Sequence, residues 1–592
     1  MGNSGTRESD ARCAGDRVVG DISRGDRMSD AHIGDDRLGP VQRERALATL
    51  QATTPEQPLD IVVIGGGVVG CGAALDAAAR GLSVGLVEMN DLAAGTSSRS
   101  SRLAHGGLRY LEQREFALVH EALTERGLLL DRLAPHLVRP VPFLFPVEKT
   151  WQRPYVASGI HLYDMLSRVG AYGGSMPRPK SLSREQAKAL APDLDTGEIA
   201  GAVRFHDAQI DDARHTVAVA RTAAARGALI ATRTRVTSLL RDGDDIVGVR
   251  VHDALTDRDY DIYARVVIGA AGVWTDDLVH LADAQAPGRV RQSKGVHLVV
   301  PAEAIRSTTA MIARTPHSVL FLLPWGKFWL VGTTDTPWSS DEGAMADPQA
   351  TQADIDYLLE QANRWLARPL TRADVVATYS GLRPLLAEDP DASGEDETTT
   401  LSREHAIIRP APGLVVIAGG KYTTYRVMAA DVVDAAVAQL DSSAREEPIP
   451  ESSTADIPLV GADGYAAMWA ERGGLAREAG LSTEAMETLL RRHGDRVTEV
   501  FEVMQTEPEL AQPLIEGAPY LKAEVVVAAT HQGASDLDDV LTRRLRVALE
   551  VPDHGEAAAR AAAPLVAEVL EWSPQETSEQ LQRYCAHVDM AG

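Results

Sequence analysis

The chain of 592 residues contains only three cysteines, Cys13, Cys71 and Cys585, which stand far apart in the sequence. Cysteines at such distances give neither a disulfide framework nor the paired spacing of a metal site, and we expect no bound metal. Cys71 falls in the first turn of an expected helix, where it suits a small core residue. The cysteine usage excludes a disulfide-stabilised secreted scaffold and fits a reducing cytoplasm.

Long apolar runs are also missing. No run approaches the roughly 20 residues that a membrane-spanning helix requires, and the N-terminus lacks the apolar core of a signal peptide. Basic residues are outnumbered, with 59 Lys and Arg against 84 Asp and Glu and a net charge of −25. A chain this acidic is a poor partner for nucleic acid, so an anionic substrate would need a local basic pocket. Attachment to a membrane surface and a homodimer both stay open.

Aromatic residues are absent from residues 1–57, which are rich in Arg, Asp, Gly and Ser. Such a segment buries too little apolar area to offset the entropy of ordering its backbone. We therefore expect residues 1–57 to form a disordered tail.

The first element expected beyond this tail is a strand. The apolar run Leu59–Ile64 predicts a buried parallel strand. Gly65, Gly67 and Gly70 follow at once in the spacing GxGxxG, and the pattern then becomes helical through alanines. In a dinucleotide-binding βαβ unit the first glycine permits a tight turn, the second lets backbone approach a pyrophosphate, and the third lets helix pack on strand. The N-terminus of the helix then faces the anion with free N–H groups.

A second apolar strand, over residues 83–87, ends at Glu88, where a ribose-binding carboxylate belongs in such a unit. Hydroxyl residues and glycines follow closely, in Thr96–Ser98 and in the pair Gly106-Gly107. This composition suits a second pyrophosphate contact and a flat ring that lies against backbone. A domain that binds NAD alone would normally continue into another βα unit, so the pattern favours a flavin dinucleotide.

The chain resembles the FAD-dependent glycerol-3-phosphate dehydrogenases of the glycine-oxidase-like flavoprotein superfamily over roughly residues 59–430. The segments that carry the resemblance are IGGGVVGCGAALDAAARGLSVGLVE, GTSSRSSRLAHGGLRYLE, SKGVHLVVP, VGTTD, YSGLRPL and GGKYTTYR. The resemblance implies an α/β fold: an FAD-binding Rossmann-like domain, a mixed-sheet substrate domain and an α-helical C-terminal domain. The expected divisions are a body at 58–445, a linker at 446–458 and a helical domain at 459–592.

FAD is the cofactor that the resemblance implies, with quinone as the electron acceptor. The residues expected to bind FAD are Gly65, Gly67, Gly70, Glu88, Thr96, Ser97, Ser98, Arg102, Leu103, His105, Gly106, Gly107, Val236, Ala270, Gly272, Gly420, Lys421, Thr423 and Thr424. Among these, Val236 resembles the residue whose backbone meets the adenine. The strand that closes on Ala270 and Gly272 resembles a third flavin contact.

The implied reaction is the oxidation of sn-glycerol 3-phosphate to dihydroxyacetone phosphate by hydride transfer to FAD. A phosphate calls for Arg or Lys, because a guanidinium can bind two of its oxygens at once. The expected substrate-binding residues are Arg109, Tyr110, His297, Arg383, Arg403 and Lys421. Arg383 and Lys421 follow glycine turns, at tight positions of the backbone.

The base is less determined by the sequence. His105 precedes the glycine pair that approaches the flavin, and a histidine titrates near neutral pH. His297 is the rival candidate, and Arg383 can polarise the substrate oxygen. His105, Arg383 and His297 are therefore the expected catalytic residues, while His105 could instead only orient the flavin ring.

The acceptor and the location also stay open. An oxygen-dependent glycerol-3-phosphate oxidase would perform the same half-reaction, and a non-catalytic flavin-binding protein is a third reading. Helical similarity to the dehydrogenases extends over 537–548, LDDVLTRRLRVA, which favours quinone. A basic-aromatic patch could attach the protein to the cytoplasmic face of the cell membrane. The residues of this expected patch are Lys149, Trp151, Arg153, Tyr155 and Arg168.

Overall fold

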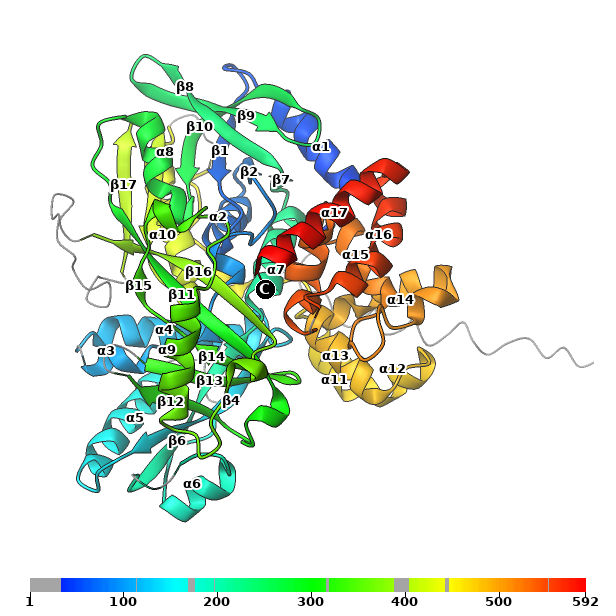
Figure 1. The fold of residues 1–592 in the computed structure, drawn as a ribbon. Coiled ribbons are helices and arrows are strands. Elements are labelled where there is room, and N and C mark those ends of the chain that lie inside the picture. Colours follow the sequence, from blue (N-terminus) through cyan, green and yellow to red (C-terminus); the bar gives the residue numbers. More distant parts are fainter. Residues whose placement is uncertain are drawn as a thin grey trace, which may run out of the picture.

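The computed structural model describes residues 34–591, apart from residues 113, 169–175, 196, 198, 316–318, 388–403, 442–446 and 552. Figure 1 shows two sheets, one above the other, with the C-terminal helices beside them. No helix within the described ranges is long and apolar enough to cross a membrane.

The first sheet is built around the glycine-rich strand. Its order is β17 (His405–Ala411), β18 (Leu414–Gly419), β10 (Arg258–Gly269), β1 (Leu59–Ile64), β2 (Val84–Val87) and β7 (Leu229–Ala231). The strand β1 pairs in parallel with β10 and with β2, so its apolar residues are covered on both faces. The hairpin of β8 (Thr234–Asp242) and β9 (Asp245–Asp253) extends the sheet from β10.

Helices cover both faces of this sheet. The helix α2 (Val68–Ala79) begins directly after the glycines and packs between α7 (Asp212–Ala225) and α10 (Tyr425–Val437). Small side chains make this close approach possible. Five of the twelve residues of α2 are alanines, and all but two of the twelve are buried. The helix α8 (Thr275–Ala282) contacts β18 and β8.

Residues 40–51 correct one expectation from the sequence. They form the helix α1, so the prediction of a disordered tail over 1–57 is wrong for this part, while residues 1–33 lie outside the described ones. Leu47 and Leu50 are buried against the first sheet, and Gly85 of β2 leaves the space that Leu50 fills. A short stripe of Ala and Leu is enough for packing here, although the segment has no aromatic residue.

The second sheet is mixed. Its order is β15 (Thr336–Pro337), β11 (Val290–Pro301), β14 (Phe328–Gly332), β13 (Val319–Trp325), β12 (Ala310–Arg314), β4 (Val138–Val147), β6 (Gly201–Ile210) and β3 (Leu103–Ala104), with β16 (Ala377–Leu386) on β11 and β5 (Lys180–Leu182) on β6. The helices beside this sheet are α3 (Leu108–Glu112), α4 (Phe116–Leu128), α5 (Gln152–Arg168), α6 (Arg184–Leu190) and α9 (Gln352–Asn363). This is the mixed-sheet substrate domain that the sequence predicts.

The C-terminal part is helical, as expected (Figure 1). Its helices are α11 (Tyr465–Ala470), α12 (Arg472–Glu478), α13 (Thr483–His493), α14 (Val497–Thr506), α15 (Lys522–Thr530), α16 (Glu556–Leu570) and α17 (Pro574–Ala591). A π-helical turn, Asp539–Arg544, lies between α15 and α16 and packs against α7. A capping box begins α17: the Ser573 hydroxyl accepts from the Glu576 N–H, and the Glu576 carboxylate accepts from the Ser573 N–H.

Candidate active site

A cavity of about 670 Å³ lies at the carboxyl ends of β1, β2, β10 and β18, where parallel sheets of this kind bind ligands. The expected cofactor residues that line it are Gly65, Gly67, Glu88, Thr96, Ser97, Val236, Ala270, Gly272, Gly420 and Lys421. These residues come from segments far apart in the sequence, so the fold brings together what the motifs predict separately.

The three glycines of the fingerprint have distinct geometries. Gly65 has φ +111°, and a Cβ there would lie 2.5 Å from the Ala270 oxygen. A Cβ on Gly70 would lie 1.9 Å from the Gly65 oxygen, so only glycine lets α2 pack this close to the turn. Gly67 lines the cavity at the N-cap of α2, where its Cβ would meet only the Ser97 hydroxyl, at 3.2 Å. A side chain on Gly67 would therefore compete with a bound pyrophosphate.

Glu88 stands at the end of β2 with both carboxylate oxygens in use. The Gly66 N–H donates to its Oε2 at 2.6 Å, and the Asn90 N–H donates to its Oε1 at 2.7 Å. Burial raises the pKa of Glu88, whereas these two donors act to lower it. Each oxygen keeps a second lone pair for a hydroxyl donor, as a ribose requires.

A second cavity, of about 440 Å³, adjoins β3, α3 and the second sheet. The expected residues Leu103, His105, Gly107, Tyr110 and Arg383 line it. The Lys421 ammonium lies 3.8 Å from the centroid of the Tyr110 ring, in a cation–π contact. Because Lys421 also lines the first cavity, these two residues join the two cavities.

Arg383 presents a positive charge to the second cavity. Its Nη2 donates to the Thr333 hydroxyl at 3.0 Å and to the Thr334 carbonyl at 3.1 Å, and its Nη1 lies 3.4 Å from Asp335 Oδ1. Asp335 and Thr333 line the same cavity. These contacts fix the plane of the guanidinium, which suits recognition of a phosphate or a polarised oxygen.

The two candidate bases differ in their surroundings. His105 lines the second cavity, with its ring edge-on to Phe321. His297 is buried deeper, and its Nε2 lies 2.9 Å from the Ser101 hydroxyl. Burial, followed by the charges of Arg383 and Arg102, lowers the pKa of His297 to about 3. His297 is therefore neutral near pH 7 and resists protonation, which makes it a weak general base.

Some expected residues stand behind the cavity walls. Arg102 is buried, with its guanidinium 4.1 Å from the Trp325 ring centroid and 5.5 Å from that of Tyr379, so its side chain does not line the cofactor cavity. Its left-handed backbone, with φ +54°, accompanies this orientation. The other expected residues outside both linings are Gly70, Ser98, Gly106, His297, Thr423 and Thr424.

Several of these residues hold the wall in place. The Gly106 N–H donates to the Tyr163 hydroxyl, and the His105 N–H donates to the Thr423 hydroxyl.

The side chain of Arg109, in α3, and the whole of Arg403 lie outside the described parts of the structure.

Sequence reasoning missed Asp335 and Ser101. Asp335 ends the motif VGTTD, which contributed only to the family resemblance. An acidic residue directly after a buried strand and two threonines is nevertheless a signal that predicts a site residue. Ser101 follows the hydroxyl-rich run that was assigned to the cofactor, and its partner His297 is 196 residues away. Only the fold brings these two together.

Comparison with known proteins shows the family to which the chain belongs. A family model described as FAD dependent oxidoreductase matches residues 60–435, which include most of the residues that line both cavities. The chain belongs to this FAD-dependent oxidoreductase family. A second model, described as the C-terminal domain of alpha-glycerophosphate oxidase, matches residues 452–577.

Relatives of this family match nearly the whole chain. It is 50% identical to a glycerol-3-phosphate dehydrogenase of Mycobacterium leprae (strain TN) over 553 residues, which cover 93% of this chain and 91% of the relative. It is 35% identical to the mitochondrial glycerol-3-phosphate dehydrogenase of Homo sapiens over 564 residues, 92% of this chain and 74% of that protein. A solved glycerol-3-phosphate dehydrogenase from Bacillus halodurans, complexed with FAD, superimposes with a TM-score of 0.75 at 27% identity, over 94% of this chain and 98% of that one.

FAD is the cofactor of this family, and the first cavity fits it. Gly272 lines the cavity with φ +57°, and a Cβ there would meet no protein atom within 4 Å, so it would point into open space that a ligand can fill. The N-terminus of α2 would hold the pyrophosphate, and the Glu88 carboxylate would hold a ribose. Gly272 would lie at an edge of the dinucleotide.

Proposed function

We propose that the protein oxidises sn-glycerol 3-phosphate to dihydroxyacetone phosphate, with FAD as the hydride acceptor. The observation that carries the proposal is the fixed guanidinium of Arg383 in a cavity that joins the cofactor cavity at Lys421. On a chain with net charge −25, a guanidinium that faces a cavity favours an anionic ligand there, although Asp335 already pairs with it. The relatives named glycerol-3-phosphate dehydrogenase support the identity of that ligand.

Each residue has a role in this reaction. Arg383 and Lys421 bind the phosphate or polarise the reacting oxygen, and Tyr110 positions the Lys421 ammonium. The hydroxyl proton of the substrate passes to a histidine, for which His105 and His297 are the two candidates. Bound FAD would supply the acceptor for the hydride that leaves C2 of the substrate. The pKa of about 3 makes the His297 imidazole a weak proton acceptor, whereas His105 lines the cavity directly, so His105 is the better supported of the two candidates.

Anaerobic titration tests the half-reaction. Glycerol 3-phosphate should bleach the flavin absorbance of the purified protein, and glycerol should not at the same concentration. His105→Asn and His297→Asn then separate the two candidate bases, because loss of the true base slows bleaching by about 100-fold or more. If glycerol 3-phosphate leaves the flavin oxidised, the proposed substrate is wrong.

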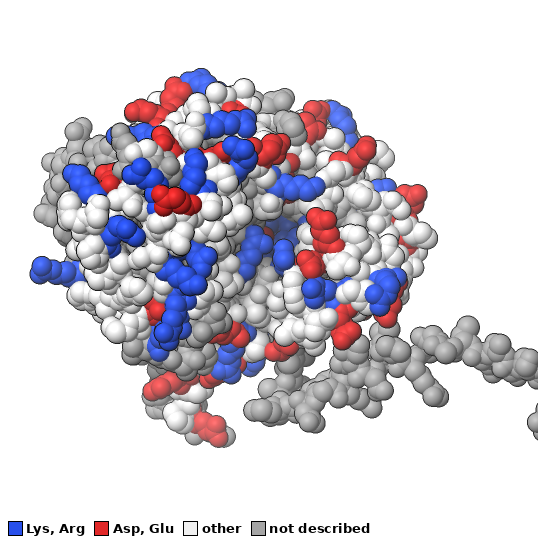
Figure 2. Space-filling model, turned by 90° about the horizontal axis from the view of Figure 1, so that it is seen from below, with Lys and Arg blue, Asp and Glu red and all other residues white. Residues whose placement is uncertain are grey.

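We further propose a quinone as the electron acceptor, reached from a membrane surface. The second cavity is lined at α4 and α5 by apolar side chains, including Phe116, Val156 and Leu162. Around them, Trp151, Tyr155 and Met165 expose 68%, 60% and 54% of their area. Figure 2 shows the molecule from below, with Lys and Arg side chains interspersed with Asp and Glu side chains and with large uncharged areas. Apolar and basic groups together favour an anionic lipid surface.

Two members of the patch expected from the sequence have partners within the protein. Arg168 pairs with Asp164 at 2.9 Å, and Arg153 donates to the Leu182 carbonyl at 3.3 Å. The proposed contact therefore depends on Lys149, Trp151 and Tyr155, with Phe116 and Met165 added. Reoxidation of the bleached enzyme by a quinone analogue and by air, with and without anionic vesicles, tests it. Fast reoxidation by air alone would support an oxidase instead.

A further inference from the structure

The segment 88–101, here named the cofactor loop, connects the two cavities. Its residues Glu88, Asn90, Thr96, Ser97 and Ser100 line the first cavity, and Ser101 lines the second. Apart from the 3₁₀ turn Thr96–Ser98 it has no regular secondary structure. A loop of this kind depends on contacts with neighbouring elements for its conformation.

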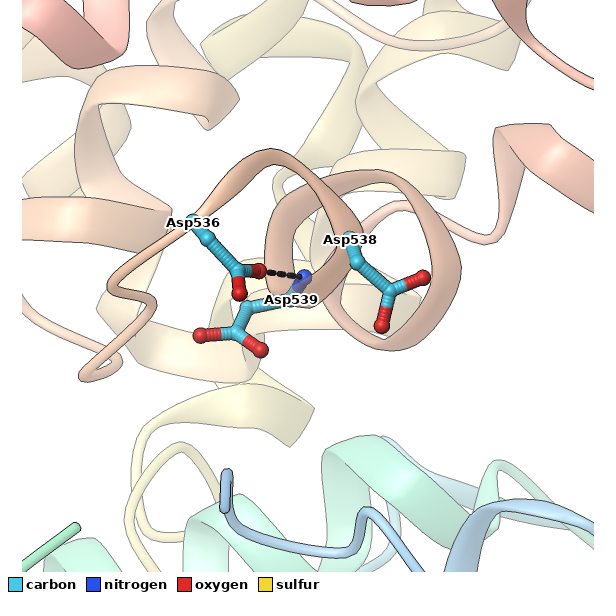
Figure 3. Close-up of side chains that lie close together, drawn as sticks. All are labelled: Asp536, Asp538 and Asp539. Carbon is cyan, nitrogen blue, oxygen red and sulfur yellow. Dashed lines mark hydrogen bonds between the residues drawn. The ribbon is translucent and has the colours of Figure 1, made fainter. Parts of the chain in front are cut away.

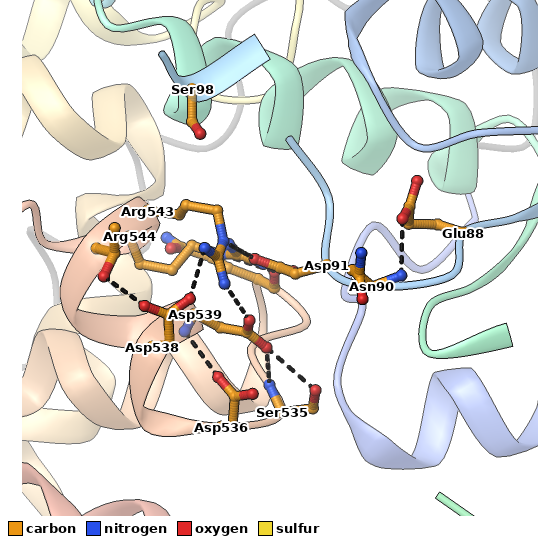
Figure 4. Close-up of polar contacts among 12 residues, drawn as sticks. Glu88, Asn90, Asp91, Ser98, Ser535, Asp536, Asp538, Asp539, Arg543 and Arg544 are labelled. Carbon is orange, nitrogen blue, oxygen red and sulfur yellow. Dashed lines mark hydrogen bonds and ion pairs between the residues drawn. The ribbon is translucent and has the colours of Figure 1, made fainter. Parts of the chain in front are cut away.

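Two arginines of the C-terminal part hold the start of the cofactor loop (Figure 4). Asp91 is 1% exposed, and its Oδ2 accepts from Arg543 Nε at 2.6 Å and from Arg544 Nη1 at 2.7 Å. Its Oδ1 accepts from Arg544 Nη2 at 2.7 Å. The Arg544 pair is thus bidentate, which fixes the orientation of the carboxylate as well as its position.

A third arginine, Arg546, holds the end of the same loop. Its Nη1 donates to the Ser98 carbonyl at 3.0 Å, and its Nη2 donates to the Asp212 carboxylate. The other oxygen of Asp212 accepts from the Ser100 N–H at 3.1 Å and from the Ser100 hydroxyl at 2.6 Å. Arg546 therefore reaches the loop both directly and through Asp212.

Acidic residues hold Arg543 in turn. Asp536, Asp538 and Asp539 lie close together before and within the π-helical turn (Figure 3), near enough to suggest a cation site. Arginines already supply the positive charge there, since Arg543 pairs with Asp538 and Asp539, and Arg233 pairs with Asp536 and Asp539 at 2.7 Å each. The aspartates therefore fix the guanidinium of Arg543.

We propose that Arg543, Arg544 and Arg546 are positioning residues for FAD: they keep the cofactor loop in its binding conformation from the C-terminal part. The proposal depends on the family's cofactor and not on the identity of the substrate. All three side chains are at least 90% buried, so loss of one removes a charged donor from a buried carboxylate or carbonyl. The loop must then reorganise, and the apparent dissociation constant of FAD rises in inverse proportion to the fraction of molecules whose loop is competent to bind.

The test measures FAD binding to apoprotein by the change in flavin fluorescence. Arg544→Lys and Arg546→Lys should each raise the dissociation constant of FAD at least tenfold, because a lysine cannot replace the bidentate geometry. At saturating FAD, the KM for glycerol 3-phosphate should change less than twofold, since Arg383 and Lys421 are untouched. This split separates a cofactor effect from general damage to the site.

Arg221→Lys is the matched control. Arg221 is equally buried and joins α7 to Glu499 of α14, with Nη1 3.1 Å from Glu499 Oε2, but it does not contact the cofactor loop. Arg221→Lys should lower the unfolding temperature of apoprotein about as much as Arg544→Lys and Arg546→Lys do. It should change FAD affinity less than twofold. Should an arginine variant fail to fold, Asp91→Asn removes the same charge pair from the loop side and is expected to weaken FAD equally. Unchanged FAD affinity in the folded loop variants, or an equal loss in Arg221→Lys, would overturn the proposal.

Discussion

His297 and Tyr379 stand directly opposite each other in the antiparallel ladder of β11 and β16, and their rings stack with centroids 4.6 Å apart and planes at 6°. The Tyr379 hydroxyl donates to the Ser100 carbonyl at 3.1 Å, which ties this stack to the cofactor loop. The Ser101 hydroxyl contacts the other side of the same imidazole, at Nε2. The plane of His297 is thus set by a cross-strand pair and not by the cavity alone.

Replacing Tyr379 should therefore reduce turnover. Tyr379→Leu removes a stacked pair worth about 0.5–1.5 kcal/mol, which predicts a fall in kcat of roughly 2- to 13-fold if His297 is the proton acceptor. Tyr379→Phe keeps the stack and should retain most of the activity. Steady-state kinetics with glycerol 3-phosphate compares the two, and equal losses would show that the hydroxyl matters more than the ring.

Removing Arg383 should impair recognition of the phosphate. Arg383→Ala removes a charge-assisted contact worth about 2–5 kcal/mol, so kcat/KM for glycerol 3-phosphate should fall about 30-fold to several thousand-fold. FAD content should stay near one per chain. Arg372→Ala, which breaks an exposed ion pair with Asp356, is the matched control and should have no measurable effect. A similar loss with glycerol as the substrate would mean that Arg383 does not recognise the phosphate.

A side chain at Gly67 should prevent FAD binding. The valine of Gly67→Val would extend from the N-cap of α2 into the first cavity, where the pyrophosphate belongs. The purified variant should be colourless, and the absorbance ratio at 450 and 280 nm checks this. The control is Gly473→Ala in α12, where an added Cβ would lie 4.0 Å from the Arg477 side chain. This variant should keep full flavin content. A yellow Gly67→Val protein would contradict the cofactor assignment.

The helix α1 should contribute substantially to stability. Leu50 is fully buried, so Leu50→Ala should lower the free energy of unfolding by about 2–5 kcal/mol. Val41, 53% exposed in the same helix, gives the control variant Val41→Ala, with an expected change within about 0.5 kcal/mol. Urea unfolding measures both. Equal midpoints for the two variants would show that α1 does not pack on the sheet in solution.

Stability should fall on mild acidification. Burial lowers the pKa of His136 and of His215 to about 3 each, so both stay neutral in the folded protein near pH 6. In the unfolded chain they take up protons below about pH 6.5, and the unfolded state therefore binds more protons between pH 6.5 and 3. The contribution of the two histidines to the free energy of unfolding is complete above pH 6.5 and is lost as the pH falls. The loss is about 1 kcal/mol per histidine at pH 5.5.

Urea midpoints at pH 7 and pH 5.5 measure this loss. His136→Gln cannot take up a proton in either state, so its midpoint should change less with pH than that of the unaltered protein. The exposed His280, in α8, provides the control His280→Gln, whose pH dependence should match the unaltered protein. An identical pH dependence in all three proteins would rule out His136 as a cause.

Local patterns predicted much of this fold. The strand β1, the three glycines and Glu88 were predictable because each signal lies within about 30 residues of one βαβ unit. The helix α1 was not, because its stripe of small apolar side chains is weak until the sheet beneath it is known. The domain boundaries at 445 and 458 stay a prediction.

Side-chain directions account for most of the remaining differences at the site. Arg102 lies in a motif that resembles a cofactor segment, yet its side chain stacks on Trp325 of the second sheet. Asp335 becomes a site residue only when β11 and β16 bring it next to Arg383. Such placements depend on tertiary packing, which no local pattern in a single sequence specifies.

The contact between Asp91 and Arg543 joins residues that are 452 positions apart. A ribosome adds about 5–20 residues per second, so roughly 20 to 90 s separate the synthesis of the two partners. Throughout that interval the cofactor loop already exists while its three guanidinium donors do not. The binding conformation of the cofactor loop can therefore form only after residues 543–546 have been made, so FAD affinity should develop late in the synthesis of the chain.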